Sequence, residues 1–260
     1  MLKRLLLTAC TTLLIVSEAM PGPQFFFGDA GDKEAPIVDG SEFVFARLIY
    51  SSGLGNFGRR ETWRTDRPDA DEHFMLGMDR LSNIRVRLND YVAVAIMDPA
   101  LFDYPFVYAV EVGFMELSQQ EAATLREYME RGGFLVVDDF WGTLQWRNFD
   151  YQLKKIFPDR EVEPIPLSHE VFHSFYDIDE ILQVPVVDRG CFNLQTWEQD
   201  GYTPYALAVF DDDRRPMLMI NHNTDLGDAW EHADEPCYPH KYSGFAYRMG
   251  INFVVYAMTH

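Results

Sequence analysis

Hydrophobic residues along the chain fall into short runs that polar and glycine-rich segments separate. Four of these runs have the length and apolar content of buried strands, at 42–50, 91–97, 106–110 and 134–137. The run at 134–137 is the strongest, because two glycines precede it and two aspartates follow it. We expect it in the middle of a sheet.

Apolar residues at helical spacing mark four further segments, at 69–81, 118–131, 146–157 and 242–258. Asp69 is expected to cap the first of these helices. Ser118 and Glu121 form a capping box at the start of the second, which a pair of glycines then ends. A proline follows the third and sets its end.

Two weaker patterns complete the expected elements. Residues 162–165 predict a short strand, and 206–210 with 217–220 predict a hairpin around three consecutive aspartates. Because strands and helices alternate over the first two thirds of the chain, we predict an α/β fold with a mostly parallel sheet and helices on both faces. Ligands bind such sheets outside the carboxyl ends of the strands. We therefore expect the functional site there.

The N-terminus has the pattern of a secretory signal peptide over residues 1–19. Lys3 and Arg4 precede an apolar stretch, and Ser17 and Ala19 supply the small residues that favour cleavage after Ala19. A membrane anchor is the alternative, but a span takes about 20 apolar residues and this stretch is shorter. The pattern predicts export to the periplasm or cell envelope.

The rest of the chain divides into an entry segment and one domain. Residues 20–41 are rich in Gly, Pro and Asp and predict a flexible N-terminal segment, whereas residues 42–260 predict a single domain with one large core. Cys10 lies in a stretch that resembles a lipoprotein box, but only Leu5 to Leu7 would remain ahead of it as the hydrophobic region. Lipidation is therefore the weaker hypothesis.

Charge narrows the range of ligands. The chain has 41 Asp and Glu against 22 Lys and Arg, which gives a formal net charge of -19. Such a surface repels phosphate backbones, so no nucleic acid is expected as a partner. Divalent cations and neutral sugars suit it better. After cleavage of the leader, Cys191 and Cys237 are the remaining thiols, and the sequence leaves open whether they form a disulfide.

Carboxylates and tryptophans gather in three loops that follow predicted strands. The candidate residues for binding a polar ligand are Trp63, Asp66, Asp69, Asp138, Trp141, Asn221, Asp228, Trp230 and His232. Asp139, Asp225 and His222 lie among them and are the candidate catalytic residues. Because all three loops leave the carboxyl ends of strands, we expect them to share one edge of the sheet.

Each of these residue types also has an ordinary structural role. Asp139 or Asp225 suits a general base, and His222 suits an acid or a metal ligand. Tryptophan faces suit sugar rings, with a place in the core as the alternative. Asp138 and Asp139 are neighbours on a strand and point to opposite faces. One is expected to face the site. The alternative is that one caps the following helix and the other binds a backbone amide or an arginine.

The spacing of candidate ligands leaves metal binding open. His and Asp are metal-ligand types, but the polar run 221–232 contains no HExxH motif and no EF-hand loop. A divalent metal is therefore allowed but not required. His169 and His173 lie four residues apart, and Ser168 would cap a helical turn that puts both rings on one face. Such a pair chelates a metal, or one ring caps and the other packs.

Several stretches carry a family resemblance, at 63–66, 68–71, 131–142, 173–178, 221–232 and 247–260. They closely resemble domain of unknown function 4159, an uncharacterised bacterial family, over about residues 43–260. The resemblance implies a flavodoxin-like fold similar to class I glutamine amidotransferases. In those enzymes the nucleophilic Cys stands on the turn after a central strand, where this chain has Asp138, Asp139 and Phe140. Without a thiol, the covalent glutaminase mechanism has no nucleophile.

Three hypotheses for function follow. The first is an exported cell-envelope protein that binds a polar ligand, such as a carbohydrate, at the carboxyl edge of the sheet. The second is a hydrolase at the same site, with or without a metal. The third is a scaffold or assembly partner of envelope membrane proteins, because members of the family also occur as periplasmic-facing parts of larger membrane proteins. The sequence does not choose between them.

Overall fold

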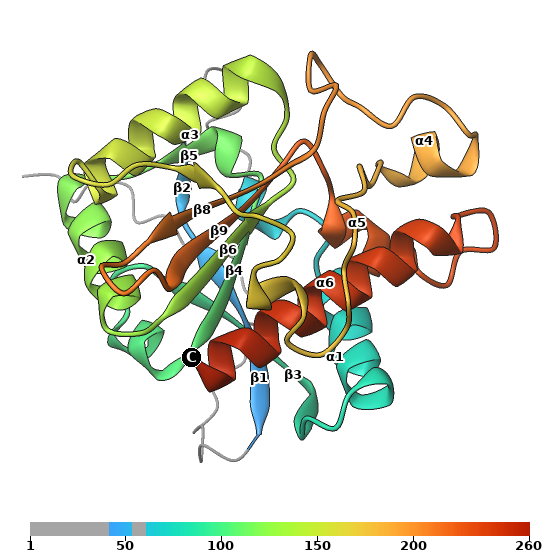
Figure 1. Ribbon diagram of the computed structural model, residues 1–260, viewed down its shortest axis with the longest axis horizontal. Coiled ribbons are helices and arrows are strands. Elements are labelled where there is room, and N and C mark those ends of the chain that lie inside the picture. Colours follow the sequence, from blue (N-terminus) through green and yellow to red (C-terminus); the bar gives the residue numbers. More distant parts are fainter. Residues whose placement is uncertain (1–41, 54–60) are drawn as a thin grey trace, which may run out of the picture. The chain divides into compact units, whose positions relative to one another are not determined.

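A seven-stranded sheet forms the centre of the described chain (Figure 1). The structure is a computed structural model that describes residues 42–53 and 61–260. From one edge to the other the strands are β3 (Val86–Ala95), β1 (Phe43–Ile49), β4 (Phe106–Val110), β6 (Phe134–Asp138), β9 (Pro216–His222), β8 (Tyr205–Phe210) and β7 (Glu163–Pro164). The predicted signal peptide, its cleavage site after Ala19, the box at Cys10 and the segment 20–41 lie outside the described residues.

Strand pairing confirms the predicted mostly parallel α/β sheet. The strands from β3 to β9 pair in parallel, and only the β9–β8 and β8–β7 pairs of this sheet are antiparallel. β6 has three strands on each side, as its apolar run predicts. The hairpin of β8 and β9 is also confirmed. β3 begins at Val86 rather than Tyr91, and β7 has two residues.

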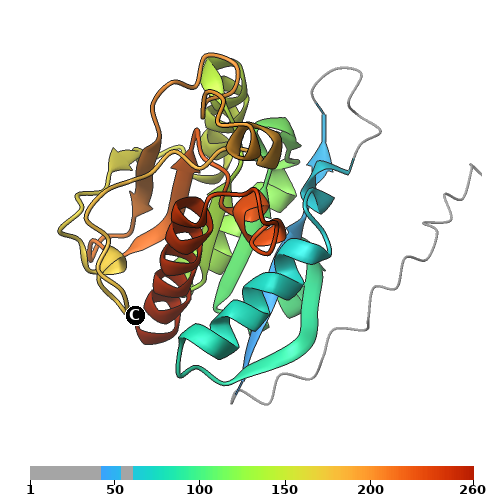
Figure 2. The same cartoon turned by 90° about the vertical axis from the view of Figure 1, so that its right-hand side faces the viewer.

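Helices cover both faces of the sheet (Figures 1 and 2). α1 (Asp69–Leu81), α5 (Leu226–Glu231) and α6 (His240–Thr259) bury their apolar residues in one core cluster. α2 (Gln119–Glu130) and α3 (Gly142–Ile156) bury theirs in the other. β1 separates the two, because Phe43 and Phe45 face the first cluster and Val44 and Ala46 face the second.

Helix ends match the sequence signals in part. The capping box of Ser118 and Glu121 begins α2, and Gly132 follows its end at a φ of +108°. The prediction that Asp69 caps α1 is wrong. The backbone already turns before it, with the Ala70 amide bonded to the Asp66 carbonyl, so Pro68 occupies the capping position and Asp69 is the first helical residue.

Short elements occupy the loops. The structure has a second, two-stranded sheet of β2 (Ser51–Ser52) and β5 (Met115–Glu116) and a short helix α4 (Val187–Cys191). Its 3-10 turns are η2 (Thr62–Arg64), η3 (Pro99–Asp103), η4 (Val112–Phe114) and η5 (Glu170–Phe172). Of these, only the helical turn at η5 was predicted, from Ser168 and the two histidines. Each is too short to show the spacing of apolar residues from which longer elements are recognised.

Of the two alternatives for His169 and His173, the structure supports the one in which one ring caps, and the chelating pair does not form. His169, rather than Ser168, caps η5, and its Nδ1 accepts a hydrogen bond from the Val171 amide. Both ring nitrogens of His173 are engaged, one with Asp177 and the other with the Leu167 carbonyl. The segment makes a single 3-10 turn instead of an α-helical one, so the two rings have separate partners.

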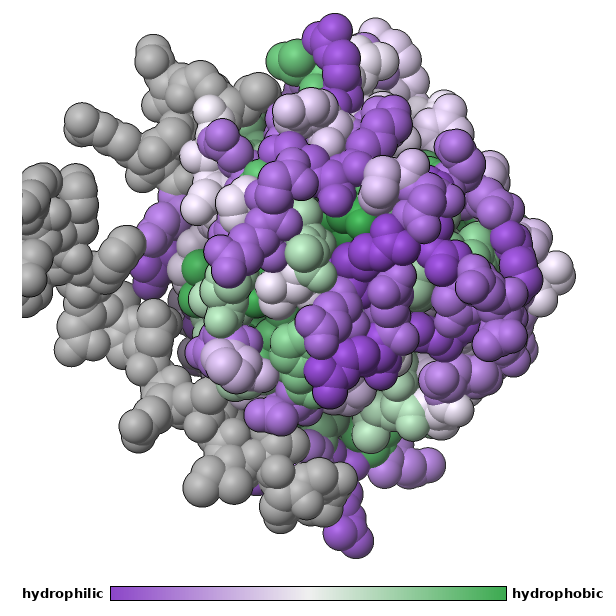
Figure 3. Space-filling model, turned by 90° about the vertical axis from the view of Figure 1, so that its left-hand side faces the viewer, coloured by the Kyte–Doolittle hydropathy of each residue, from purple (hydrophilic) through white to green (hydrophobic). Residues whose placement is uncertain are grey.

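Cys191 and Cys237 form the disulfide that the sequence left open, with their Cα atoms 4.8 Å apart. The bond joins the end of α4 to the loop before α6. Within the described residues, no helix combines the length and the apolar character needed to cross a bilayer. On the side of α2 and α3, hydrophilic residues cover most of the visible surface, in keeping with the acidic composition (Figure 3).

We predict that replacing both cysteines, Cys191→Ser with Cys237→Ser, lowers the free energy of unfolding by about 2–4 kcal/mol. The bond spans 46 positions of sequence, and opening so long a loop gives the unfolded chain more freedom. Thermal unfolding should show a fall in Tm of roughly 4–16 °C. Reductant should lower the Tm of the wild type to that of the double variant and leave the variant unchanged. Equal Tm values for the two proteins under oxidising conditions would contradict this.

Candidate functional site

Three carboxylates meet at the carboxyl edge of the sheet. Asp139 follows β6, Asp225 follows β9 and caps α5, and Asp66 lies in the loop before α1. One carboxylate oxygen of each lies within 4.8 Å of the others. Loops that are far apart in sequence therefore bring three negative side chains to one place, as the positions of the strand ends predict.

Backbone hydrogen bonds hold two of these loops together. The Asp139 amide donates to the Thr224 carbonyl at 3.2 Å, and the Asn223 amide donates to the Phe140 carbonyl at 3.0 Å. Asp66 and Asp139 both have left-handed backbones, with φ of 65° and 49°. Aspartate accepts this conformation more readily than most residues, but it still costs energy. The surrounding structure thus imposes the positions of these carboxylates.

Burial and mutual repulsion shape the chemistry of this set. Asp139 and Asp225 are 7% and 4% exposed, and Asp66 is partly exposed as a whole residue. Burial raises the pKa of all three carboxyls, and the negative charge of Asp139 raises the pKa of Asp66 and Asp225 further. Each carboxylate is therefore less stable as an anion here than in water.

A second acidic set adjoins the first on α5. Asp228, Glu231 and His232 each place one ligand atom within 4.8 Å of the others. Their spacing of three and four residues puts them on one face of the helix. Asp225 links the two sets, because its Oδ1 accepts a hydrogen bond from the Asp228 amide at 2.8 Å.

Two carboxylate oxygens of these sets are buried without a hydrogen bond to the described residues, Oδ2 of Asp66 and Oδ2 of Asp228. Asp228 is 5% exposed as a whole. The Asp66 oxygen lies beside Gly227, where an added Cβ would stand 2.6 Å from it. A side chain at position 227 would therefore fill the space in front of this oxygen. Buried oxygens of this kind need a proton or a cation.

Asp138 has a different role from its neighbour. Its Oδ2 accepts hydrogen bonds from the Tyr108 hydroxyl at 2.8 Å and from the Leu226 and Gly227 amides at 2.7 and 3.2 Å. These bonds attach the start of α5 to β6. As expected for adjacent positions at a strand end, Asp138 and Asp139 point to different partners, and Asp138 positions the helix that carries the second set.

Arg47 supports the site but is not among the site residues predicted from the sequence. Its side chain is fully buried in β1, with Nε 3.0 Å from Oδ1 of Asp71. Its Nη1 also donates to the Thr65 carbonyl at 2.7 Å, which fixes the loop that carries Asp66. The sequence does contain a sign of this role, because Arg47 is the one charged residue in the apolar run of β1.

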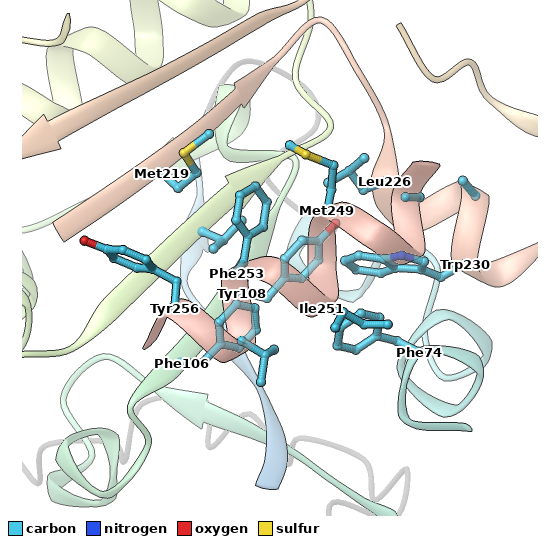
Figure 4. Packing of buried hydrophobic residues seen from close by; sticks show 14 of the residues in the cluster. Phe74, Phe106, Tyr108, Met219, Leu226, Trp230, Met249, Ile251, Phe253 and Tyr256 are labelled. Carbon is cyan, nitrogen blue, oxygen red and sulfur yellow. The ribbon is translucent and has the colours of Figure 1, made fainter. Parts of the chain in front are cut away.

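The three tryptophans take the core alternative. Trp63, Trp141 and Trp230 are 5%, 2% and 1% exposed. Trp230 packs against Phe74 and Tyr108, with ring centroids 4.4 and 5.3 Å apart (Figure 4). No face of these rings is open for a sugar. Trp141 still contributes to the acidic set, because its Nε1 donates to Asp139 at 2.8 Å.

Of the other candidates, His222 stands outside both acidic sets. Its ring contacts Phe140 and Trp146, and burial lowers its pKa to about 4, so it is neutral at pH 7. Asn221 is buried at 2% exposure, and Asp69 is exposed. The structure therefore groups Asp139 and Asp225 as predicted but separates them from the histidine.

The sequence profile described as Domain of unknown function (DUF4159) matches residues 44–258. The chain belongs to the DUF4159 family. No curated protein matches it significantly. The matched range includes both acidic sets of this DUF4159 protein, together with Arg47 and its partner on α1.

For this DUF4159 protein, we predict that Asp71→Asn lowers the free energy of unfolding by about 3–5 kcal/mol, because it removes the counter-charge that is hydrogen-bonded to the buried Arg47 guanidinium. Urea unfolding at pH 7 measures the change. Replacing the pair together, Arg47→Met with Asp71→Leu, should restore most of the stability. Asp159→Asn, which breaks the exposed pair with Arg126, is the matched control and should have a much smaller effect. Equal losses for Asp71→Asn and Asp159→Asn would refute the assignment.

Proposed function

We propose that this DUF4159 protein is an exported cell-envelope protein that binds a polar, oxygen-rich ligand through a divalent cation at the carboxyl edge of the sheet. The observation that carries the proposal is the meeting of Asp66, Asp139 and Asp225, with one oxygen of each within 4.8 Å. Three carboxylates held this close need either protons or a cation to relieve their mutual repulsion.

The magnitude of the repulsion supports this. Two unit charges 4.8 Å apart repel by about 3.5 kcal/mol at an effective dielectric constant of about 20, and the set contains three such pairs. Arg47 is the nearest buried cation, but Asp71 already pairs with it. A bound divalent cation would turn the repulsion into attraction, whereas protonation would only remove it.

The donor atoms indicate the type of cation. Asp66, Asp139 and Asp225 offer oxygen only, which suits Ca²⁺, Mg²⁺ or Mn²⁺. Calcium takes about 6–8 oxygen ligands, so three carboxylates leave coordination positions for oxygens of a ligand. This is the physical link between a cation here and a hydroxyl-rich ligand such as a carbohydrate. His232 in the second set adds a nitrogen donor, which suits a transition metal better.

We further propose that the sheet is flavodoxin-like and similar to that of class I glutamine amidotransferases. The strand order with a central β6 and helices on both faces supports this. The turn after β6, where those enzymes have their cysteine, carries Asp139 with a φ of 49°. The sheet would then be retained for a chemistry without a thiol nucleophile.

A second candidate function, a hydrolase at the same site, is favoured by that turn. Strained turns between a strand and a helix present catalytic groups in other α/β folds. Asp139 is fixed there by the hydrogen bond from Trp141 and has a raised pKa because of its burial. Its carboxylate would then take a proton from the attacking water.

We predict that Ca²⁺, Mg²⁺ or Mn²⁺ raises the Tm of chelator-treated protein. A cation at a hundred times its Kd stabilises the fold by about 2.7 kcal/mol, which corresponds to roughly 5–11 °C. Asp225→Asn should abolish the shift. Asparagine still caps α5, and the variant should have a higher Tm than the wild type without metal, because it removes a repelling charge.

Two controls sharpen this thermal test. Asp103→Asn removes an exposed carboxylate before β4, at the opposite end of the sheet, and should keep the full shift. His232→Gln should also keep it if the all-oxygen set is the site. No shift with any of the three cations, or an equal shift in Asp225→Asn, would disprove the cation site.

For the hydrolase, we predict that Asp139→Asn lowers turnover by a factor of about 10²–10⁴ and keeps the fold, because asparagine still accepts the bond from Trp141. Hydrolysis of p-nitrophenyl acetate, p-nitrophenyl phosphate and p-nitrophenyl glycosides measures turnover, and far-UV circular dichroism reports the fold. Asp103→Asn should retain full activity. A wild type that turns over none of these substrates, or an active Asp139→Asn, counts against the hydrolase.

A further inference from the structure

A cavity of about 200 Å³ lies between β9, β8 and the start of α3. Its lining residues are Gly142, Thr143, Asp200, Tyr202, Thr203, Tyr205, His222 and Asn223. Apart from His222, none of them is among the site residues predicted from the sequence. Pockets for drug-sized molecules have volumes of about 300–1,000 Å³. This cavity is smaller, so it suits one small ring.

Exposed aromatic side chains surround this cavity. Tyr202 is 66% exposed and Tyr205 is 47% exposed. Trp197, 38% exposed, packs its ring edge-to-face on Tyr202 at 5.7 Å. The three tryptophans proposed for sugar binding are buried, whereas these rings are open to solvent. Open aromatic rings beside a polar cavity suit a ligand that has both C–H faces and hydroxyl groups.

His222 forms a buried wall of the cavity. Its ring is 8% exposed and stacks on Tyr205, with an interplanar angle of 17° and centroids 6.2 Å apart. Nε2 lies 3.4 Å from the Gly142 carbonyl, and among the described residues Nδ1 has no hydrogen bond. If Nε2 carries the proton toward that carbonyl, Nδ1 is an acceptor for a ligand hydroxyl.

Hydrogen bonds hold the polar part of the wall in place. The Asn223 side chain accepts from the Gly142 amide at 2.8 Å and donates to the Thr203 carbonyl at 2.7 Å. Asp200 accepts from the amide and the hydroxyl of Thr143 at 2.8 and 2.7 Å. These bonds connect the loop before β8, the end of β9 and the start of α3, so the cavity is formed before any ligand arrives.

We propose that this cavity is a second ligand subsite that takes a single neutral sugar ring, with Tyr202 and Tyr205 against its C–H face and His222 accepting a hydroxyl hydrogen bond. The Asp200 carboxylate at the wall and the net charge of -19 disfavour an anionic ring.

This inference deepens the proposed function by naming the ligand class, but it rests on different residues. The cavity and the acidic sets share two loops. Phe140 to Gly142 continue directly from Asp139, and Asn223 stands two positions before Asp225. The two sites are thus connected through the backbone of these loops.

The test is saturation-transfer NMR with three probes, methyl β-glucoside, methyl β-galactoside and N-acetylglucosamine. A single ring of this size should bind with a Kd on the order of 1 mM. Tyr202→Ala, Tyr205→Ala and His222→Phe should each weaken binding by about tenfold. The last keeps an aromatic ring against Phe140 and Trp146 and removes only the nitrogens. Tyr205→Phe should retain binding, because it keeps the ring.

Tyr151→Ala is the matched control, because Tyr151 is 62% exposed on α3 and lies outside the cavity lining. It should bind sugar as the wild type does. No saturation transfer from the folded wild type to any probe, or transfer in all three cavity variants equal to that of the wild type, overturns the proposal.

The chelator-treated protein and Asp225→Asn separate this proposal from the cation site. Sugar binding in the cavity should persist in both, since no lining residue belongs to the acidic sets. Loss of the thermal shift with retained sugar binding then disproves the cation alone. Loss of sugar binding with a retained thermal shift disproves the subsite alone.

Discussion

Among the described residues, Arg47 is the one cation that is fully buried, and the carboxyl edge of the sheet depends on how its donors are satisfied. A guanidinium removed from water requires acceptors in fixed directions. Asp71 on α1 and the carbonyl of Thr65 supply them. The loop between η2 and α1 is therefore held against β1, and Asp66 comes into the acidic set with it. A core residue that touches no ligand thus sets the geometry of the site.

Two adjacent aspartates show how the fold separates support from function. Asp138 accepts three hydrogen bonds, and two of them connect β6 to the start of α5. Asp139, one residue later, receives one from Trp141 and faces other carboxylates. The protein retains this unfavourable arrangement in loops that hydrogen bonds hold in place at the end of the sheet. Such local conflict is typical of sites under selection for something other than stability.

The sequence predicted the parts of the fold that repeat over many residues. The strand runs, the helix 69–81 and the sheet edge where the carboxylates meet all came from periodicity and from the rule for strand ends. α5 was not predicted, because it lies in a polar run without apolar residues at helical spacing. Hydrogen bonds to Asp138 and the packing of Trp230 hold this helix instead. His222 was grouped with Asp225 by proximity in the chain, but its ring points to the α3 side, whereas α5 packs on the opposite face. The exposed Tyr202 and Tyr205 could not be recognised from the sequence, because the exposure of a side chain depends on the tertiary structure.

The disulfide closes a covalent ring that contains part of the candidate site. The segment from Cys191 to Cys237 contains β8, β9 and α5, together with Asp225 and the whole second acidic set. A protease that cleaves an exposed loop inside this ring leaves both new ends tied to the same molecule. A chain nicked in this way keeps its halves covalently joined, whereas the halves of an open chain would be held by noncovalent contacts alone.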